Sequence, residues 1–144
     1  MFEGTIISVG RGTFRAFEII GNPLIKDTAF SFIPEPIPGM SEKPPLQGKT
    51  CYGYDLKAFA GEYLKYKGEI FLPWIIELFC ELDKNPAAGS FFNEKTFDRL
   101  AGNSTLRKQI SEGKSVEEIK QSWQADLAKY KIMRKKYLLY QDFE

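Results

Sequence analysis

The first half of the chain alternates short β-prone runs with glycine and proline turns. The runs TIISV, AFEII and FSFIP are bounded by these residues, which predicts short paired strands. From Cys51 to Leu56 the side chains alternate between two faces, so a further strand is predicted there. Between them, residues 34–48 hold five of the eight prolines. We expect an ordered excursion over the surface at these residues, with an interdomain linker as the alternative.

The second half has helical periodicity. Nearly every position from Ile70 to Leu82 is apolar, and the polar exceptions recur every four residues. This pattern predicts a mostly buried helix with Pro73 in its first turn. Two short helices are expected next, ending at Gly102 and Gly113, with Ser104 as the N-cap of the second.

The last predicted helix begins at Ser115, where the sequence SVEE forms a capping box with Glu118. An apolar stripe at three- and four-residue spacing is predicted to face the core; it consists of Val116, Ile119, Trp123, Leu127 and Tyr130. Five of the eight residues from 129 to 136 are basic and none is acidic. This run is typical of a solvated helix end stabilised by the helix dipole, more than of a patch for an anionic partner.

Together these elements predict an α/β fold of the α+β-like kind, in which a small mixed sheet from the N-terminal half packs against C-terminal helices. The length of 144 residues and a hydrophobic content of 43% favour one domain over residues 1–144. The predicted core consists of Trp74, Ile75, Leu78, Phe79, Trp123 and Leu127.

The composition narrows the possible chemistry. With 20 basic and 19 acidic residues the net charge is +1, which does not favour a nucleic-acid partner. Histidine is absent, so the usual base near neutral pH and the commonest metal ligand are missing. Cys51 and Cys80 are too few for a four-cysteine zinc site, and we expect two unpaired, buried thiols. No metal and no cofactor are therefore expected.

From the sequence we expect no membrane span and no signal peptide. Its longest apolar stretch, from Ile70 to Leu82, is shorter than the roughly 20 residues that a spanning helix needs, and it carries Glu77 and Glu81. A basic segment followed by an apolar run is not visible at the start.

The opening stretch MFEGTIISVGRGTF gathers polar residues around three glycines; they are Glu3, Thr5, Ser8, Arg11 and Thr13. A dinucleotide-binding fingerprint is excluded because Arg15 occupies the third glycine position and no helix follows. A tight glycine turn that presents Arg11 remains. A guanidinium suits carboxylate recognition, although an ordinary surface turn explains the pattern equally well.

The stretch EGTIISVGRGTFRAFEIIGNP resembles the second half of the bacterial exo-β-N-acetylmuramidases, a glycoside-hydrolase family long catalogued as a domain of unknown function. The similarity continues through FSFIPEPIPG, PPLQGKTCYGYDL, FFNEKTFDRLAGNSTLRKQI, SVEEIKQSW and KKYLLY. It implies a small α/β half that packs against a Rossmann-like partner domain, with the sugar bound between them. It also implies removal of terminal N-acetylmuramic acid from peptidoglycan fragments, a role in cell wall recycling, and a periplasmic or secreted location.

The resemblance further implies that Glu3, Thr5, Ser8, Arg11 and Thr13 bind the substrate. Arg11 is expected to bind the lactyl carboxylate of muramic acid, with Glu3 as an accessory carboxylate and Glu18 in a structural role. The catalytic carboxylate is expected in the Rossmann-like half, which is missing here or separately encoded. Two positions depart from the family pattern: Ile6 replaces an Asn and Ala16 replaces a Pro.

Three functions follow. The leading one is the substrate-binding half of a muramidase, from a split or truncated gene and inactive alone. The alternative is a non-catalytic carbohydrate-binding or protein-interaction domain that retains the family fold. The third is a self-sufficient hydrolase, which would need two carboxylates about 5 to 9.5 Å apart. The only candidate pairs are Glu3 with Glu18 and Glu3 with Asp55.

Overall fold

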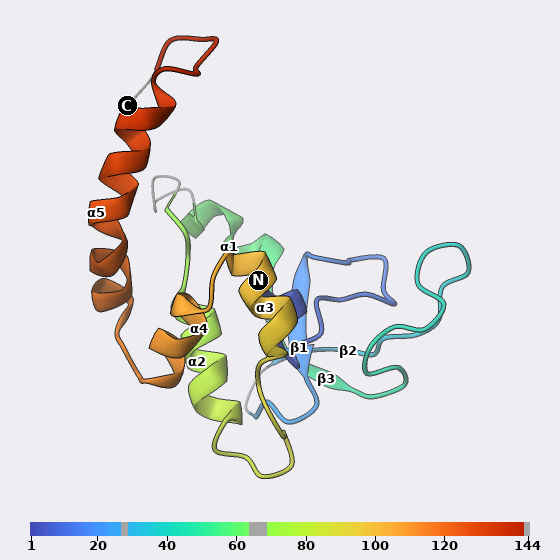
Figure 1. Cartoon of the computed structure of the whole chain (residues 1–144). Helices are drawn as coiled ribbons and strands as arrows, with labels where there is room; N and C mark the ends of the chain where they lie inside the picture. The colour runs from blue at the N-terminus through green and yellow to red at the C-terminus, as the bar shows by residue number, and fades with distance from the viewer. Residues whose placement is uncertain (27–28, 64–68, 143–144) are drawn as a thin grey trace.

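The computed structural model describes residues 1–26, 29–63 and 69–142, and shows a small sheet, a group of short helices beside it and one long helix that projects away from both (Figure 1). In chain order the elements are η1 (Phe2–Gly4), β1 (Ile19–Asn22), β2 (Phe30–Phe32), β3 (Cys51–Asp55), α1 (Leu56–Tyr63), α2 (Pro73–Leu82), α3 (Glu94–Ala101), α4 (Thr105–Ser111) and α5 (Val116–Arg134). The α/β class predicted from the sequence is confirmed.

The sheet has the strand order β1-β3-β2, and both pairings are antiparallel, so among the described residues the sheet is antiparallel and not mixed as predicted. Ile20 lies opposite Tyr54 on one side of β3, and Ser31 lies opposite Tyr52 on the other. Gly53 makes the central strand possible, because a Cβ atom there would collide with the carbonyl oxygen of Ile20. The strands predicted from FSFIP and from Cys51 onward are confirmed.

The strand predicted for TIISV is wrong. This segment makes only isolated bridges, from Thr5 to Phe92 and from Ser8 to Gly21. Its backbone hydrogen bonds are divided between two distant segments, since Ile6 donates to the carbonyl of Phe91 and Ser8 donates to that of Gly21. A β-ladder needs consecutive hydrogen bonds to one partner strand, which this segment lacks. It therefore forms no strand and connects the edge of the sheet to the residues before α3.

The three strands of the sheet are shorter than predicted. In FSFIP the strand ends at Phe32. In AFEII the strand begins only at Ile19, because Phe17 has a φ of 67° and turns the backbone. Beyond Asp55 the alternation ends, and α1 starts at Leu56. The Asp55 carboxylate accepts a hydrogen bond from the backbone N–H of Lys57 at 3.0 Å, which satisfies one free donor at the helix start.

The helices largely follow the sequence. Pro73 is the first residue of α2, as predicted, and Ile75, Leu78 and Phe79 of this helix are buried in the core. The predicted stop at Gly102 is confirmed, with a φ of 85°.

The cap of α4 differs from the prediction in its chemistry. Ser104 occupies the N-cap but its side chain makes no capping bond. The Asn103 carboxamide oxygen accepts from the N–H of Thr105 instead, at 2.8 Å.

The long helix α5 starts on the body and then leaves it (Figure 1). The predicted capping box of Ser115 and Glu118 is confirmed, and Ile119 is fully buried. Trp123 is only partly buried against the core. The prediction that Leu127 belongs to the core is wrong, because 41% of its surface is exposed. With 19 residues, α5 is longer than the surface of the sheet and short helices that covers its first turns.

The proline-rich residues 34–48 form the expected ordered excursion, with no regular strand or helix (Figure 1). This loop is attached to the N-terminal turn: Glu35 donates its N–H to the carbonyl of Gly12 at 2.8 Å. A Cβ atom on Gly12 would lie 2.6 Å from Pro44. The glycine therefore allows the proline loop to approach the opening stretch, where the candidate site lies.

Candidate functional site

The opening stretch borders an open cleft of about 640 Å³. We name it the Arg11 cleft. Four of the five site residues predicted from the sequence line it, namely Glu3, Thr5, Ser8 and Arg11, together with residues from β1, the proline loop and α3. Thr13 lies in an adjoining hollow of about 160 Å³ that also contains Arg11 and Phe17. The sequence therefore located one wall of this cleft.

The hydroxyl groups of the opening stretch shape its backbone. Thr5 donates its hydroxyl to the carbonyl of Phe2 at 2.7 Å, and the Ser8 hydroxyl accepts from the N–H of Gly10 at 3.2 Å. Thr13 donates to the carbonyl of Gly10 at 2.7 Å. Such local bonds favour turns over regular elements. The three residues thus hold the turn that presents Arg11.

Arg11 is held at the rim of the cleft by two neighbours. Its Nη2 atom donates to the Glu3 carboxylate at 2.6 Å, and the two side chains are 50% and 39% exposed. The guanidinium also lies over the ring of Phe17, 5.4 Å from its centroid. An exposed ion pair contributes at most about 1 kcal/mol, and the guanidinium has further donors, so a ligand carboxylate can compete for Arg11.

Phe17 is a residue that pattern analysis of the sequence did not assign to the site. Its positive φ is unusual for a bulky residue, and backbone strain of this kind recurs at functional positions. More than half of the surface of Phe17 is exposed. No spacing in the sequence indicates this conformation.

Two further cations, Lys49 and Arg99, line the Arg11 cleft. They come from the segment before β3 and from α3, so their positions in the sequence do not associate them with Arg11. Within the described ranges neither forms an ion pair, and Glu3 is the only carboxylate on the lining. The resulting excess of positive charge favours an anionic ligand.

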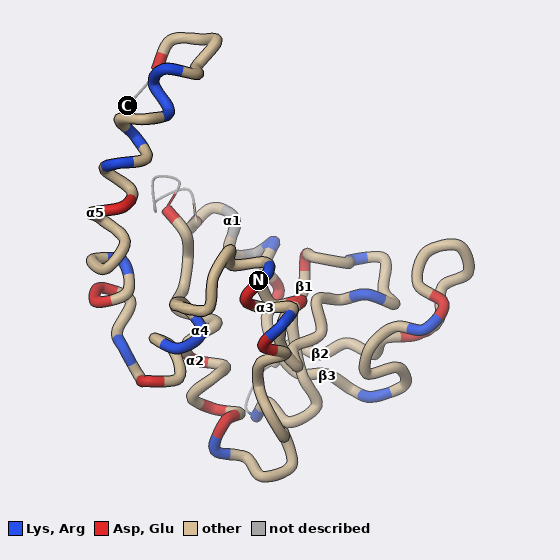
Figure 2. Tube along the Cα trace, in the orientation of Figure 1, with Lys and Arg blue, Asp and Glu red and all other residues tan. Residues whose placement is uncertain are grey.

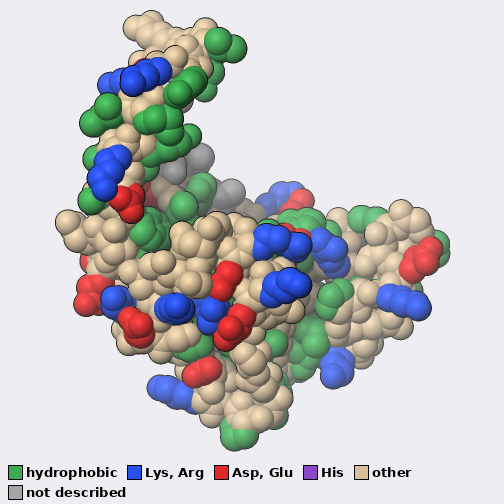
Figure 3. All heavy atoms as spheres, viewed as in Figure 1, with side chains coloured by type: hydrophobic (Ala, Val, Ile, Leu, Met, Phe, Trp, Pro, Cys, Tyr) green, Lys and Arg blue, Asp and Glu red, His purple; other side chains and the backbone are tan. Residues whose placement is uncertain are grey.

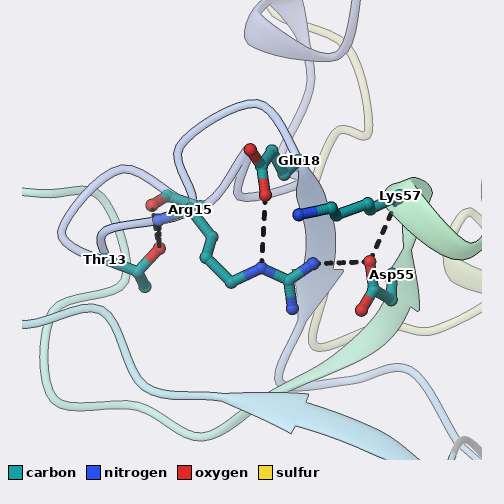
Figure 4. Close-up of polar contacts among 6 residues, drawn as sticks. Thr13, Arg15, Glu18, Asp55 and Lys57 are labelled. Carbon is teal, nitrogen blue, oxygen red and sulfur yellow. Dashed lines mark hydrogen bonds and ion pairs between the residues drawn. The ribbon is translucent and has the colours of Figure 1, made fainter.

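A second polar cluster, drawn in Figure 4, is not part of the lining of the Arg11 cleft. Arg15 bonds to Asp55 at 2.6 Å and to Glu18 at 3.4 Å, which links the turn after Gly12 to the end of β3. The hydrogen bond that Arg15 donates to the Asp55 carboxylate raises the pKa of Arg15 above its ordinary value. This ion pairing agrees with the structural role predicted for Glu18. It also occupies Glu18 and Asp55, the two carboxylates considered as partners of Glu3 in a self-sufficient hydrolase.

The cysteines are unpaired, as predicted, but only one is buried. Cys51 lies inside the sheet, and burial raises the pKa of its thiol to about 11. Cys80 is exposed, which contradicts the prediction of two buried thiols. It precedes Glu81 on the solvent side of α2.

Neither a metal site nor a membrane helix is found in the part of the chain that the structure describes. Over residues 1–26, 29–63 and 69–142 no three Cys, Asp or Glu side chains are grouped so that they could hold a metal ion. Over the same ranges no helix combines the length and apolarity needed to cross a bilayer.

Comparison with known proteins gives consistent matches along the chain. The family model described as "Exo-beta-N-acetylmuramidase NamZ, C-terminal" matches residues 1–140. Peptidoglycan beta-N-acetylmuramidase NamZ of Bacillus subtilis (strain 168) is 33% identical over 150 residues, covering 97% of this chain and 35% of the relative. A crystal structure of a DUF1343 family protein from Bacteroides fragilis NCTC 9343 has a TM-score of 0.83 and 40% identity, covering 98% of this chain and 38% of that one.

The chain thus spans little more than a third of the length of either relative. The family match extends over residues 1–140, and the structural match covers 98% of the chain. The chain belongs to the family of exo-beta-N-acetylmuramidase NamZ C-terminal domains.

Proposed function

We propose that this chain is the substrate-binding part of a NamZ-type peptidoglycan hydrolase and that it binds a muramic acid sugar in the Arg11 cleft. One observation carries the proposal: an open cleft presents an exposed guanidinium, with Lys49 and Arg99 also on its lining. The sugar class comes from the name of the Bacillus subtilis relative.

The charge of the sugar explains why Arg11 is central. N-acetylmuramic acid differs from N-acetylglucosamine by a lactyl ether that ends in a carboxylate. Arg11 can donate two parallel hydrogen bonds to such a group, and the Phe17 ring holds the guanidinium in place. Lys49 and Arg99 add favourable potential for the same charge. The Glu3 carboxylate accepts a hydrogen bond from Arg11 and would share this guanidinium with the sugar carboxylate.

Arg11→Ala tests this proposal. A charge-assisted hydrogen bond contributes about 1.5 to 3 kcal/mol, so the affinity for N-acetylmuramic acid should fall by about ten- to a hundredfold. Affinity for N-acetylglucosamine, which has no carboxylate, should stay nearly unchanged. Isothermal titration calorimetry of both sugars gives the comparison.

Lys95→Ala is the matched control, because it removes a positive charge from exposed α3 surface outside the cleft lining. It should leave the affinities for both sugars unchanged. Equal losses for the two sugars in Arg11→Ala would remove the proposed role of Arg11.

A second candidate is a carbohydrate-binding domain without catalysis. It is favoured by one observation: among the described residues, Glu3 is the only carboxylate on the cleft lining, and it is bonded to Arg11. Both candidates predict sugar binding. They differ in whether hydrolysis follows when the remaining part of a NamZ-type protein is supplied.

A further inference from the structure

The apolar stripe of α5 continues beyond the surface that covers it. Ile119 is buried and Trp123 partly buried, but Leu127 and Tyr130, which lie next on the same stripe, are 41% and 54% exposed. Figure 3 shows hydrophobic side chains along the projecting part of this helix. A stripe with helical periodicity is expected to face a partner surface. The sheet and the short helices supply such a surface only for the first turns of α5.

The residues after α5 extend this exposed apolar surface. The chain turns back at the end of the helix (Figure 1), and Arg134 binds Asp142 at 2.8 Å, with both side chains mostly buried. The turn carries Tyr137, Leu139 and Tyr140, all strongly exposed, with Leu139 at 99%. We define the α5 arm as Leu127, Tyr130, Met133, Tyr137, Leu139 and Tyr140. Contiguous exposed apolar surface of this kind marks interaction sites.

Basic side chains accompany the α5 arm. Residues 129–136 include five Lys or Arg and no acidic residue, and Figure 2 shows basic positions recurring along the outer part of α5. A partner surface that is apolar and has carboxylates around its edge would complement both features.

The relatives contain additional chain that could form such a surface. This chain matches 35% and 38% of the two relatives, and the family model describes a C-terminal region. The remaining chain of such a protein therefore precedes the position that corresponds to Met1. Met1 borders a hollow of about 420 Å³ together with Trp123 of the α5 stripe. A preceding segment would thus reach the surface beside the root of the arm.

We propose that the α5 arm docks against the N-terminal part of a NamZ-type protein, whether that part is joined to this chain or is a separate polypeptide. The contact would cover Leu127 and Tyr130 and bring carboxylates of the partner near the lysines of α5. The inference rests on the family match and the exposed stripe, and it does not depend on which sugar occupies the Arg11 cleft.

Thiol labelling can test the contact. In a Cys80→Ser background, Leu127→Cys places a probe on the arm, and Ala125→Cys places one on roughly the opposite side of α5, since two residues advance a helix by about 200°. Both variants are made in the 144-residue chain alone and in a fusion to the part of Bacillus subtilis NamZ that precedes its matched region. Maleimide labelling rates are then compared.

In the chain alone, both thiols should label at similar rates. In the fusion, labelling at position 127 should slow at least tenfold and labelling at position 125 should change less than twofold. Similar rates at both positions in the fusion would overturn the proposal.

Two further measurements keep the test decisive. If buried Cys51 labels in the fusion as fast as in denaturant, the fusion is misfolded, and the two parts are mixed as separate polypeptides instead. Leu127→Asp should then weaken their association at least tenfold more than Ala125→Asp, and the absence of any association would overturn the proposal.

Sedimentation velocity of the 144-residue chain alone checks the other possible occupant, a second copy. A monomer is expected at tens of micromolar. A dimer that Leu127→Asp dissociates and Ala125→Asp leaves intact would assign the α5 arm to self-association and overturn the proposal.

Discussion

At the scale of single residues, two arginines four positions apart have different environments. Arg11 is half exposed in an ion pair with nearby Glu3, whereas Arg15 binds Asp55, which is 40 positions away in the sequence. The glycines on either side of Arg11 made it predictable that a tight turn exposes this side chain. The partner of Arg15 was not predictable, because only the pairing of β1 with β3 brings Asp55 close.

Cys51 should make stability depend on alkaline pH. Its thiol is fully buried, and burial raises its pKa from 9.0 to about 11. The unfolded thiol therefore ionises at lower pH than the folded one. The buried, protonated thiol thus stabilises the folded state by about 2 to 3 kcal/mol. This stabilisation is complete below pH 9 and is lost as the pH rises from 9 to 11.

Urea unfolding of the wild type and Cys51→Ala between pH 8 and 10.5 measures this contribution. The difference in unfolding free energy between them should shrink as the pH rises, since only the wild type carries the buried thiol. Cys80→Ala, which removes an exposed thiol, should show no such trend. Parallel pH profiles for wild type and Cys51→Ala would contradict the assignment.

At the scale of elements, local chemistry was predictable and distant pairing was not. Pro73 at the start of α2, Gly102 after α3 and the capping box at Ser115 depend on a few neighbouring residues. The predicted strand at TIISV failed because its hydrogen bonds are divided between Phe91 and Gly21. Periodicity predicted the core-facing side of α5 correctly only for its first turns, up to Trp123, and wrongly for Leu127 and Tyr130. It carries no information on how far the covering surface extends.

The two halves of the α5 stripe should respond differently to truncation. Ile119→Ala removes atoms from the buried core and should lower the unfolding free energy by about 2 to 5 kcal/mol. Leu127→Ala changes an exposed site and should stay within about 0.5 kcal/mol. Urea unfolding of the 144-residue chain measures both. Equal losses would mean that Leu127 is packed in the isolated chain, contrary to its exposure.

At the scale of the whole molecule, the candidate site could be only half predicted. Glu3, Thr5, Ser8 and Arg11 meet at one cleft because they lie within a single short turn-rich segment. Lys49 and Arg99 join them only after the proline loop and α3 have packed against that segment. The sequence alone therefore indicated where a ligand could bind but not the full positive charge of the cleft.

The last prediction concerns the carboxylates that this chain can offer for catalysis. Glycosidases of the common kind need two carboxylates beside the scissile bond, but the described lining of the Arg11 cleft offers only Glu3, and Arg15 engages both Glu18 and Asp55. The 144-residue chain alone should therefore release no product from a chromogenic muramic acid glycoside. Fusion to the preceding part of Bacillus subtilis NamZ should restore turnover, and Arg11→Ala in that fusion should lower kcat/KM by about ten- to a hundredfold. Turnover by the lone chain would show that its own carboxylates suffice, and a folded fusion that binds the sugar without turnover would favour the non-catalytic binding domain.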